Sequence, residues 1–306
     1  MFKIKWIYVS LVLLVCLLIL KIYYHNTDVS LYKVKNSNRT YSDQKIWLIS
    51  FASEGIHIQN QNNLMMSASI YQAFDVIIPY QPHHIEPEYY KKHKEILSQK
   101  RGAGYWLWKP YFILKTLNLM AENDILLYLD SSSVLRDGIY GLLELGKKHD
   151  ITVFPNFHNN RGYVKRTIIK KITNDDSSIL DKVQIEGNIL LLKNTKSTRE
   201  IVKEWLEYSE DPALLTDVSS EEEFLDFKDN RHDQAILSVM YHKNPKGFNL
   251  YEAYPARMES VIVTRRKNQC SMIPVTFNNK TKFTWWDNLK YRSIIWLIGC
   301  QRFKGH

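Results

Sequence analysis

The sequence predicts an α/β fold in which helices flank a mostly parallel sheet. Short apolar segments at 45–51, 75–79 and 124–130 alternate with longer segments of helical character. Segment 45–51 reads Lys-Ile-Trp-Leu-Ile-Ser-Phe, a nearly continuous apolar run of the kind found in strands that are buried on both faces of a parallel sheet. A hydrophobic content of 45% and a charged content of 24% are ordinary values, which argue against a disordered chain and against a polytopic membrane protein.

The other elements follow in chain order from the same patterns. Helices are expected at 60–74, 83–99 and 111–120, with Pro110 in the first turn of the third. After the strand at 124–130, the sequence predicts a helix at 138–149, a strand at 151–155, an apolar run at 183–192, and helices at 198–208 and 231–242. No internal repeat interrupts this alternation, so we expect one globular domain over residues 45–306.

The N-terminus carries a candidate membrane anchor. Residues 6–20 are apolar or small apart from Ser10, and counting on to Tyr24 gives nineteen residues. That length spans a bilayer if Lys21 extends its ammonium group to the interface. A cleaved signal peptide is the alternative, although no small-x-small cleavage site follows the run. We therefore expect a cytoplasmic tail at 1–5, an uncleaved transmembrane signal anchor at 6–24 and a stem at 25–44.

A globular domain that follows a short N-terminal tail favours a type II membrane protein, with the domain in the lumen of the Golgi or the ER. Sequons at Asn38 and Asn279, and a weaker one at Asn268, fit a lumenal glycoprotein. Cys270 and Cys300 are the two cysteines outside the anchor, and their spacing does not establish that they pair. A bacterial inner membrane is the alternative location.

The net charge of +9 is spread along the chain, with basic clusters at 91–94, 147–148, 161–171 and 265–267. Such an excess is compatible with an anionic substrate, a phosphate-rich membrane surface or nucleic acid, and also with ordinary solvated lysines. We expect an anionic small-molecule substrate, membrane contact through residues 6–24, and no nucleic-acid partner.

Residues 101–111 form the most unusual segment of the chain. They read Arg-Gly-Ala-Gly-Tyr-Trp-Leu-Trp-Lys-Pro-Tyr and hold four aromatic side chains, two glycines and two cations. A nucleotide diphosphate needs a flat apolar wall for its base, and cations and backbone N–H groups for its phosphates. Core packing is the alternative for the two tryptophans. The predicted ligand contacts in this segment are Arg101, Gly102, Gly104, Trp106, Trp108 and Lys109.

Asp130 ends the apolar run Ile-Leu-Leu-Tyr-Leu, at the carboxyl end of a predicted strand. Open α/β sheets bind their ligands at this edge. The Asp130 carboxylate is therefore a candidate ligand for a metal that bridges a diphosphate, and Ser131 and Ser132 are candidate contacts of the phosphates. An aspartate that only caps a turn at the strand end is the alternative.

Two further segments supply polar candidates. Residues 231–234 read Arg-His-Asp-Gln and open a predicted helix, where His232 is a candidate metal ligand and Asp233 a candidate base or orienting group. Glu186 lies just ahead of an apolar strand and is a candidate catalytic carboxylate near the acceptor. An aspartate in a first helical turn also stabilises the helix dipole, and the Glu186 segment is also compatible with a plain turn.

Together these motifs resemble a group of glycosyltransferase-like proteins with the nucleotide-diphospho-sugar transferase (GT-A) fold. The likeness covers residues 45–245 and is carried by Arg101-Gly-x-Gly-Tyr-Trp-Leu-Trp-Lys-Pro-Tyr, Leu127-Tyr-Leu-Asp, Ile185-Glu-Gly-Asn and His232-Asp-Gln. It implies a Rossmann-type sheet, a nucleotide-sugar donor, a glycan or glycoconjugate acceptor and a divalent metal, commonly Mn²⁺. It also implies that Asp130 is the first acid of a strand-ending Asp-x-Asp metal motif and that His232 completes the metal shell.

One departure from that pattern affects the metal. Residues 130–132 read Asp-Ser-Ser, so the second acid is absent: the metal would bind more weakly, or Ser132 and water would replace the lost ligand. A metal-independent enzyme is an alternative. The sequence therefore predicts a membrane-anchored glycosyltransferase, with a catalytically inactive glycan- or nucleotide-sugar-binding relative as the alternative. A phosphoester hydrolase with Asp130 as nucleophile is a further alternative. Retaining and inverting enzymes share the fold, so these motifs do not predict the stereochemical outcome.

Overall fold

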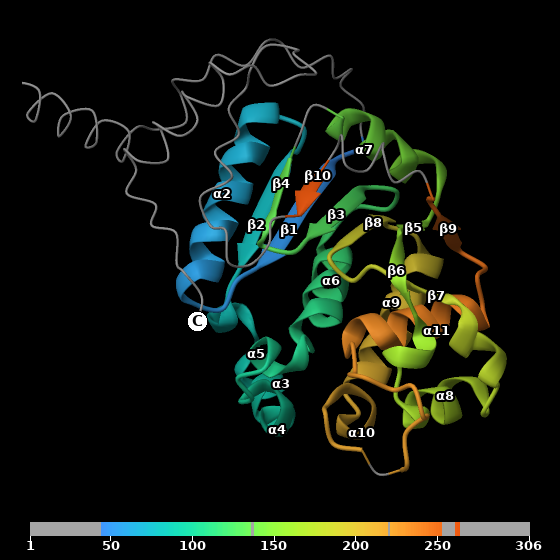
Figure 1. Ribbon diagram of the computed structural model, residues 1–306. Coiled ribbons are helices and arrows are strands. Elements are labelled where there is room, and N and C mark those ends of the chain that lie inside the picture. Colours follow the sequence, from blue (N-terminus) through green and yellow to red (C-terminus); the bar gives the residue numbers. More distant parts are fainter. Residues whose placement is uncertain (1–43, 136–137, 220, 253–260, 264–306) are drawn as a thin grey trace, which may run out of the picture.

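The computed structural model describes residues 44–135, 138–219, 221–252 and 261–263, with a six-stranded sheet at the centre (Figure 1). In spatial order its strands are β2 (Val76–Tyr80), β1 (Ile46–Phe51), β3 (Ile125–Leu129), β8 (Ile189–Lys193), β5 (Ile151–Val153) and β9 (Phe248–Leu250). β1 is parallel to β2 and β3, and β5 is parallel to β9, whereas β8 is antiparallel to both β3 and β5. Five strands thus share one direction, which confirms the predicted mostly parallel α/β sheet.

Helices cover both faces of the sheet. One face packs against α2 (Gly55–Tyr71) and α7 (Ile139–Lys148), and the other packs against α6 (Trp108–Leu119), α9 (Lys196–Ser209) and α11 (Asp233–Lys243). Successive side chains of a strand point to opposite faces of the sheet, so a single strand contributes side chains to the cores under both sets of helices. In β3, Leu127 belongs to the core under α2 and α7, whereas Tyr128 belongs to the core under α6 and α9.

The strand order reverses beside β1. From β1 the chain passes through α2 to β2 on one side, and it then returns to β3 on the other side of β1. Loops that leave neighbouring strands in opposite directions open a crevice at the carboxyl edge of a sheet. Residues 51–54 and 130–132 lie at this point of the fold.

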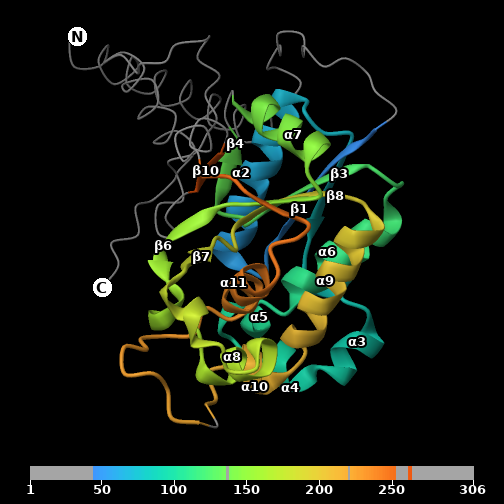
Figure 2. The same ribbon diagram turned by 90° about the vertical axis from the view of Figure 1, so that its right-hand side faces the viewer.

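Shorter elements complete the chain (Figure 2). The helical ones are η2 (Pro82–His84), α3 (Pro87–Lys92), α4 (Lys94–Leu97), α5 (Gly102–Tyr105), η3 (Asn160–Gly162), α8 (Arg166–Thr173), η4 (Ser177–Asp181) and α10 (Pro212–Leu215). The short strands β4 (Ser133–Leu135) and β10 (Val261–Val263) form one antiparallel pair, and β6 (Pro155–Asn159) and β7 (Val183–Ile185) form another.

Segment 83–99 is not the single helix that its polarity predicted. It divides into η2, α3 and α4, because Pro87 begins a new helix and His93, with φ −111° and ψ 27°, breaks the backbone between α3 and α4. A proline starts helices well and continues them badly, which explains the first break.

Two other segments add detail to the predicted elements. The apolar run at 183–192 is two strands, β7 and β8, separated by residues 186–188. The basic segment 161–171 contains most of α8, a helix that was not predicted for this segment. Ile168, Ile169 and Ile172 form the buried face of α8.

Several predictions concern residues outside those that the structure describes. These are the tail, the anchor at 6–24, the stem up to residue 43, the sequons and the two cysteines near the C-terminus. Within the described residues, no helix combines the length and the apolar character that crossing a bilayer requires. The anchor therefore stays a prediction.

Candidate active site

A cleft of about 670 Å³ opens at the carboxyl ends of β1 and β3. Its walls come from the loops after these two strands, the aromatic segment, the turn at 186–188 and the start of α11. The cleft therefore lies where the strand order reverses, which is where open α/β sheets bind ligands.

Eleven of the twelve predicted site residues line this cleft, although they come from four separate parts of the sequence. They are Arg101, Gly102, Trp106, Trp108, Lys109, Asp130, Ser131, Ser132, Glu186, His232 and Asp233. The twelfth, Gly104, does not line it. The structure thus brings the predicted residues together, while the role of each remains a prediction.

Residues 102–106 form a left-handed helical turn, which we call the aromatic turn. Their φ angles are 58°, 51°, 97°, 50° and 62° in chain order. Glycine adopts these φ values readily. In Ala103, Tyr105 and Trp106 the left-handed conformation costs roughly 1–2 kcal/mol of conformational free energy per residue. The Trp106 ring packs over Gly102, where an added Cβ would lie 2.3 Å from the indole. Glycine at 102 therefore allows the tryptophan to fold back beside the cleft.

The structure corrects the prediction that Gly104 contacts a ligand. Gly104 is buried with φ 97°, and a Cβ there would lie 2.8 Å from the Cα atom of Leu97 in α4. Trp108 is also mainly a packing residue, because it is 5% exposed and stacks on Phe51 with ring centroids 4.0 Å apart. Both residues hold the aromatic turn in place.

Lys109 is a buried cation, 3% exposed, between two carboxylates. Its Nζ lies 2.8 Å from Asp233 Oδ2 and 3.6 Å from Asp130 Oδ1, and it donates a 2.8 Å hydrogen bond to Gly187 O. This ammonium group lines the cleft and is already paired inside the protein, and its contact with a phosphate stays a prediction. Lys109 links the carboxylate after β3 to the carboxylate that begins α11.

Asp130 follows the last residue of β3, as predicted, and its backbone N–H donates to Asn188 O at 2.9 Å. Its Oδ1 accepts a 2.5 Å hydrogen bond from the hydroxyl of Tyr128. Burial, and next the charge of Asp130, raise the pKa of Tyr128 well above its usual value, so this hydroxyl keeps its proton. The hydrogen bond from Tyr128 and the contact with Lys109 both involve Oδ1, and the Asp130 side chain is 23% exposed. One oxygen of Asp130 is thus available to a ligand.

Asp233 is a carboxylate in the first turn of α11, with a side chain that is 4% exposed. Burial raises its pKa to about 6, while Lys109 acts in the opposite direction. A carboxylate that titrates near neutrality can exchange protons with a substrate. Glu186 is buried as well, and it lines the same cleft.

His232 precedes α11 with φ 53° and ψ −121°, a backbone conformation that costs a non-glycine residue about 1–3 kcal/mol. Its Nδ1 lies 2.7 Å from Leu215 O, so Nδ1 carries the ring proton and donates a hydrogen bond to this carbonyl. Burial lowers the pKa of His232, which favours the neutral ring. Nε2 then carries a lone pair, and this atom is buried and has no hydrogen-bond partner among the described residues. The ring also stacks on Trp106, with centroids 5.1 Å apart.

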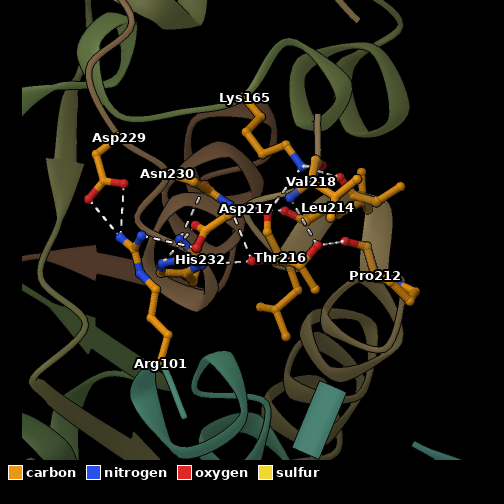
Figure 3. Close-up of polar contacts among 12 residues, drawn as sticks. Arg101, Lys165, Pro212, Leu214, Thr216, Asp217, Val218, Asp229, Asn230 and His232 are labelled. Atoms are coloured by element: carbon orange, nitrogen blue, oxygen red, sulfur yellow. Dashed lines mark hydrogen bonds and ion pairs between the residues drawn. The ribbon is translucent and has the colours of Figure 1, made fainter. Parts of the chain in front are cut away.

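Arg101 joins the aromatic turn to the mostly irregular residues 216–219 and 221–232 (Figure 3). One terminal nitrogen donates to Asp217 at 3.0 Å, and the other donates to both carboxylate oxygens of Asp229 at 2.8 Å. The side chain is still 41% exposed at the cleft. A phosphate would therefore compete with two carboxylates for Arg101 or bind its remaining N–H groups.

The protein ligands for a metal are few. Among the described residues, no group of three or more His, Cys, Asp and Glu side chains is arranged to hold a metal ion. Two atoms in the cleft do fit such a role, the lone pair of His232 Nε2 and Asp130 Oδ2. Mg²⁺ and Mn²⁺ are often held by one or two carboxylates together with substrate phosphates and water. A metal in this cleft would therefore need a bound phosphate and water as ligands in addition to these residues.

Further residues line the cleft that no motif of the sequence indicates: residues 52–54, His57, Asn156 and Asn230. Residues 52–54 directly follow β1, so the reasoning that identified Asp130 after β3 applies to them as well. Asn156 and Asn230 reach the cleft through the packing of distant segments, and no local pattern marks them.

No protein-family model matches the chain, and no curated protein matches it in sequence. Solved structures that align with it include a glycosyltransferase involved in glycosylation of the major capsid of PBCV-1, with 11% identity, 74% of this chain and 96% of that chain covered, and a TM-score of 0.41. Mouse xyloside xylosyltransferase 1 aligns with 11% identity, coverage of 85% and 95%, and a TM-score of 0.42. The galactosyltransferase LgtC aligns with 12% identity, coverage of 84% and 98%, and a TM-score of 0.42. With every TM-score below 0.5, the functional proposal depends on the site itself.

Proposed function

We propose that this protein is a glycosyltransferase, which moves a sugar from a nucleotide-sugar donor to a glycan or glycoconjugate acceptor. The observation that supports this most is the place of Asp130, a strand-end carboxylate with an available oxygen in a cleft that also contains the buried Lys109–Asp233 pair. A donor site needs a carboxylate that attracts a cation to the diphosphate, and it needs separate carboxylates beside the sugar.

The charges around the cleft favour a diphosphate that binds together with a cation. Four basic and four acidic side chains line the cleft, so their formal charges balance. They are Lys100, Arg101, Lys109 and Arg231, and Glu54, Asp130, Glu186 and Asp233. A nucleoside diphosphate alone would add uncompensated negative charge. We therefore propose a divalent metal, Mn²⁺, with Asp130 and His232 as its protein ligands, and when bound it would stabilise the diphosphate leaving group.

The residues around Asp130 are proposed to hold the rest of the donor. Arg101, the backbone of Gly102, and Ser131 and Ser132 would contact the phosphates, since all four line the cleft. Trp106 presents an aromatic ring at the same wall and would pack against the base or the ribose.

Asp233 and Glu186 are the proposed catalytic carboxylates. Lys109 stabilises the ionised form of Asp233, and its hydrogen bond to Gly187 O fixes the pair relative to the turn that carries Glu186. An ionised carboxylate at this place can stabilise positive charge at the anomeric carbon or accept the proton of an acceptor hydroxyl.

Donor binding and transfer can be measured separately. Calorimetric titration of the full chain with a panel of nucleotide sugars, with and without Mn²⁺, reports binding, and release of nucleoside diphosphate on adding acceptor glycans reports transfer. We expect Asp130→Asn to lose metal-dependent donor binding. Asp233→Asn should bind the donor and lose about 100-fold or more in transfer. Asp175→Asn, on an exposed loop, is the matched control. A wild-type protein that binds no donor would refute the proposal.

A catalytically inactive, nucleotide-sugar-binding relative is the second candidate. It is favoured by Ser132 at the place of the second acid and by the small number of metal ligands among the described residues. Such a protein would bind a donor without releasing nucleoside diphosphate. Ser132→Asp restores the acid and should tighten binding of the Mn²⁺–nucleotide complex. Transfer by the unmodified protein would exclude this candidate.

We also propose that residues 6–24 anchor the protein as a type II membrane protein of the Golgi or the ER. The apolar run and the sequons support this arrangement. We expect the chain to resist extraction by alkaline carbonate and Leu14→Arg/Leu17→Arg to be released into the soluble fraction. A glycosidase-sensitive shift in mass that disappears in Asn38→Gln would place the stem in the lumen.

A further inference from the structure

Lys165 is a buried lysine that the proposed chemistry does not involve. It is 1% exposed, immediately precedes α8 and does not itself line the cleft. The ion pairs found among the described residues do not include Lys165, and burial lowers its pKa although the charges of Glu223, Asp217 and Asp211 act in the opposite direction. Burial of an ammonium group without a carboxylate partner is uncommon, because removing the charge from water is costly.

Backbone carbonyls hold this ammonium group instead (Figure 3). Nζ donates to Ala213 O at 2.6 Å, to Thr216 O at 3.1 Å, and also to Val218 O. These carbonyls belong to the end of α10 and to the turn that follows it. Carbonyls at a helix end have no partner within the helix, so a buried donor is needed to satisfy them. Lys165 therefore fixes the path of residues 213–218.

The same turn makes hydrogen bonds to two residues that line the cleft, His232 and Arg101. Leu215 O accepts the hydrogen bond from His232 Nδ1 at 2.7 Å, and Asp217 accepts one from Arg101 at 3.0 Å. Leu215 and Asp217 alternate along the chain with the residues whose carbonyls bind Lys165. Their positions are therefore set by the contacts of Lys165 on either side.

Asn230 contacts the turn as well, from the cleft. Its Nδ2 lies 3.3 Å from Leu214 O, 3.2 Å from Leu215 O and 3.3 Å from Thr216 O. Its Oδ1 accepts from the backbone N–H of His232 at 3.2 Å. The carbonyl of Leu215, which accepts the hydrogen bond from His232, is thus part of a turn that Lys165 and Asn230 hold together.

We propose that Lys165 is a positioning residue for the cleft. It holds residues 213–218 so that Leu215 O fixes the Nδ1–H tautomer and the orientation of the His232 ring, and so that Asp217 holds Arg101. A histidine whose Nδ1–H donates to a backbone carbonyl offers Nε2 as its lone pair, to a metal or to a hydrogen-bond donor. This role holds for any ligand of the cleft, and only its effect on nucleotide affinity rests on the proposed function.

The test compares Lys165→Met, which removes the charge and the donors, with Lys171→Met on the exposed side of α8. Two-bond ¹H–¹⁵N spectra of the full chain distinguish the histidine tautomers, and His232→Gln identifies the signals of His232. We expect the Nδ1–H tautomer in the wild type and in Lys171→Met, and a mixture with the Nε2–H tautomer in Lys165→Met. Where the wild type binds a nucleoside diphosphate with Mn²⁺, Lys165→Met should bind it several-fold more weakly.

A folded Lys165→Met protein with an unchanged His232 tautomer would overturn the proposal. If that variant does not fold, Lys165→Gln is measured in the same way, because its shorter side chain keeps two of the three N–H donors while it loses the charge. Unfolding of both variants would assign Lys165 to overall stability and would also overturn the positioning role. A wild type that binds no nucleoside diphosphate contradicts the proposed function, whereas the tautomer comparison would still decide the role of Lys165.

Discussion

Asp130 and His232 line the same cleft, but the chain holds them there by different means. Asp130 continues β3, a fully buried strand paired on both sides, and its N–H is bonded to the backbone of Asn188. His232 has a positive φ and depends on a hydrogen bond to Leu215 O. We call residues 51–54 and 130–132 the sheet side of the cleft, and residues 212–219 and 221–233, which carry His232 and Asp233, the fastened side.

The difference teaches where the cleft can change without loss of the fold. The sheet side is held by cooperative backbone pairing and by two apolar cores, so its geometry survives the loss of a surface contact. The fastened side is held by individual polar contacts from Arg101, Lys165 and Asn230. Substitutions there should change ligand binding more than they change the free energy of unfolding. Lys109 joins the two sides through Asp130 and Asp233, so the largest effects are expected at Lys109.

Lys109→Met should have the largest effect on stability. It leaves the Asp233 carboxylate buried without its partner at 2.8 Å and removes the cation that faces Asp130. Removing one partner of a buried pair costs about 3–5 kcal/mol. We expect this loss in the free energy of unfolding measured by urea denaturation.

The double variant Lys109→Met/Asp233→Asn tests the cause of that loss. It removes the second charge as well, so it should be more stable than Lys109→Met alone. A double variant that is less stable than Lys109→Met would show that packing of the lysine chain, and not its charge, joins the two sides.

Asp233 should make stability depend on pH. Its pKa is about 6 in the folded protein against an ordinary value of 3.8, so the folded state binds the proton more tightly than the unfolded state does. Stability from this group is therefore greatest below about pH 4 and is lost as the pH rises through 6, by about 3 kcal/mol in total.

Urea denaturation of the wild type and of Asp233→Asn at pH 4 and pH 7 measures this directly. The difference in unfolding free energy, wild type minus variant, should fall by about 2 kcal/mol between the two pH values, because pH 4 lies close to the unfolded pKa of 3.8. A difference that is the same at both would mean that the buried carboxylate is ionised at no extra cost, and that Lys109 compensates it fully.

The same contrast explains what the sequence could predict. Asp130 was predictable because an apolar run that ends on an acid places that acid at the carboxyl edge of a sheet. The glycines of residues 101–111 indicate an unusual backbone but not which contacts it makes. The sequence therefore predicts a ligand contact for Gly104, whereas the structure packs Gly104 against Leu97. The partners of Arg101 and Lys165 lie 116 and 51 residues away in the chain, in an irregular segment without periodicity. Only tertiary packing decides such contacts.

Glycine substitutions should show a smaller and more local effect. Gly104→Ala and Gly55→Ala both place a side chain at positive φ, 97° and 50°, at roughly 1 kcal/mol or more each. Gly104→Ala also meets the backbone of Leu97 at 2.8 Å, whereas no atom lies within 4 Å of the Cβ added at Gly55. Overpacking against backbone adds about 1–3 kcal/mol. Thermal unfolding should therefore rank Gly104→Ala below Gly55→Ala, and equal stabilities would contradict the close contact.

Arg101→Gln should have the smallest effect on stability and a clear effect on binding. The Arg101 side chain is 41% exposed and its two carboxylate partners are 38% exposed, and such pairs contribute at most about 1 kcal/mol. If the guanidinium also contacts phosphate, the affinity for a nucleoside diphosphate should fall about tenfold. Asp229→Asn separates the two roles, because it weakens the same ion pair and leaves the cation in place. We expect Asp229→Asn to keep or increase the affinity, since the phosphate then meets less competition. If both variants lose affinity equally, Arg101 acts only by holding the fastened side against the aromatic turn.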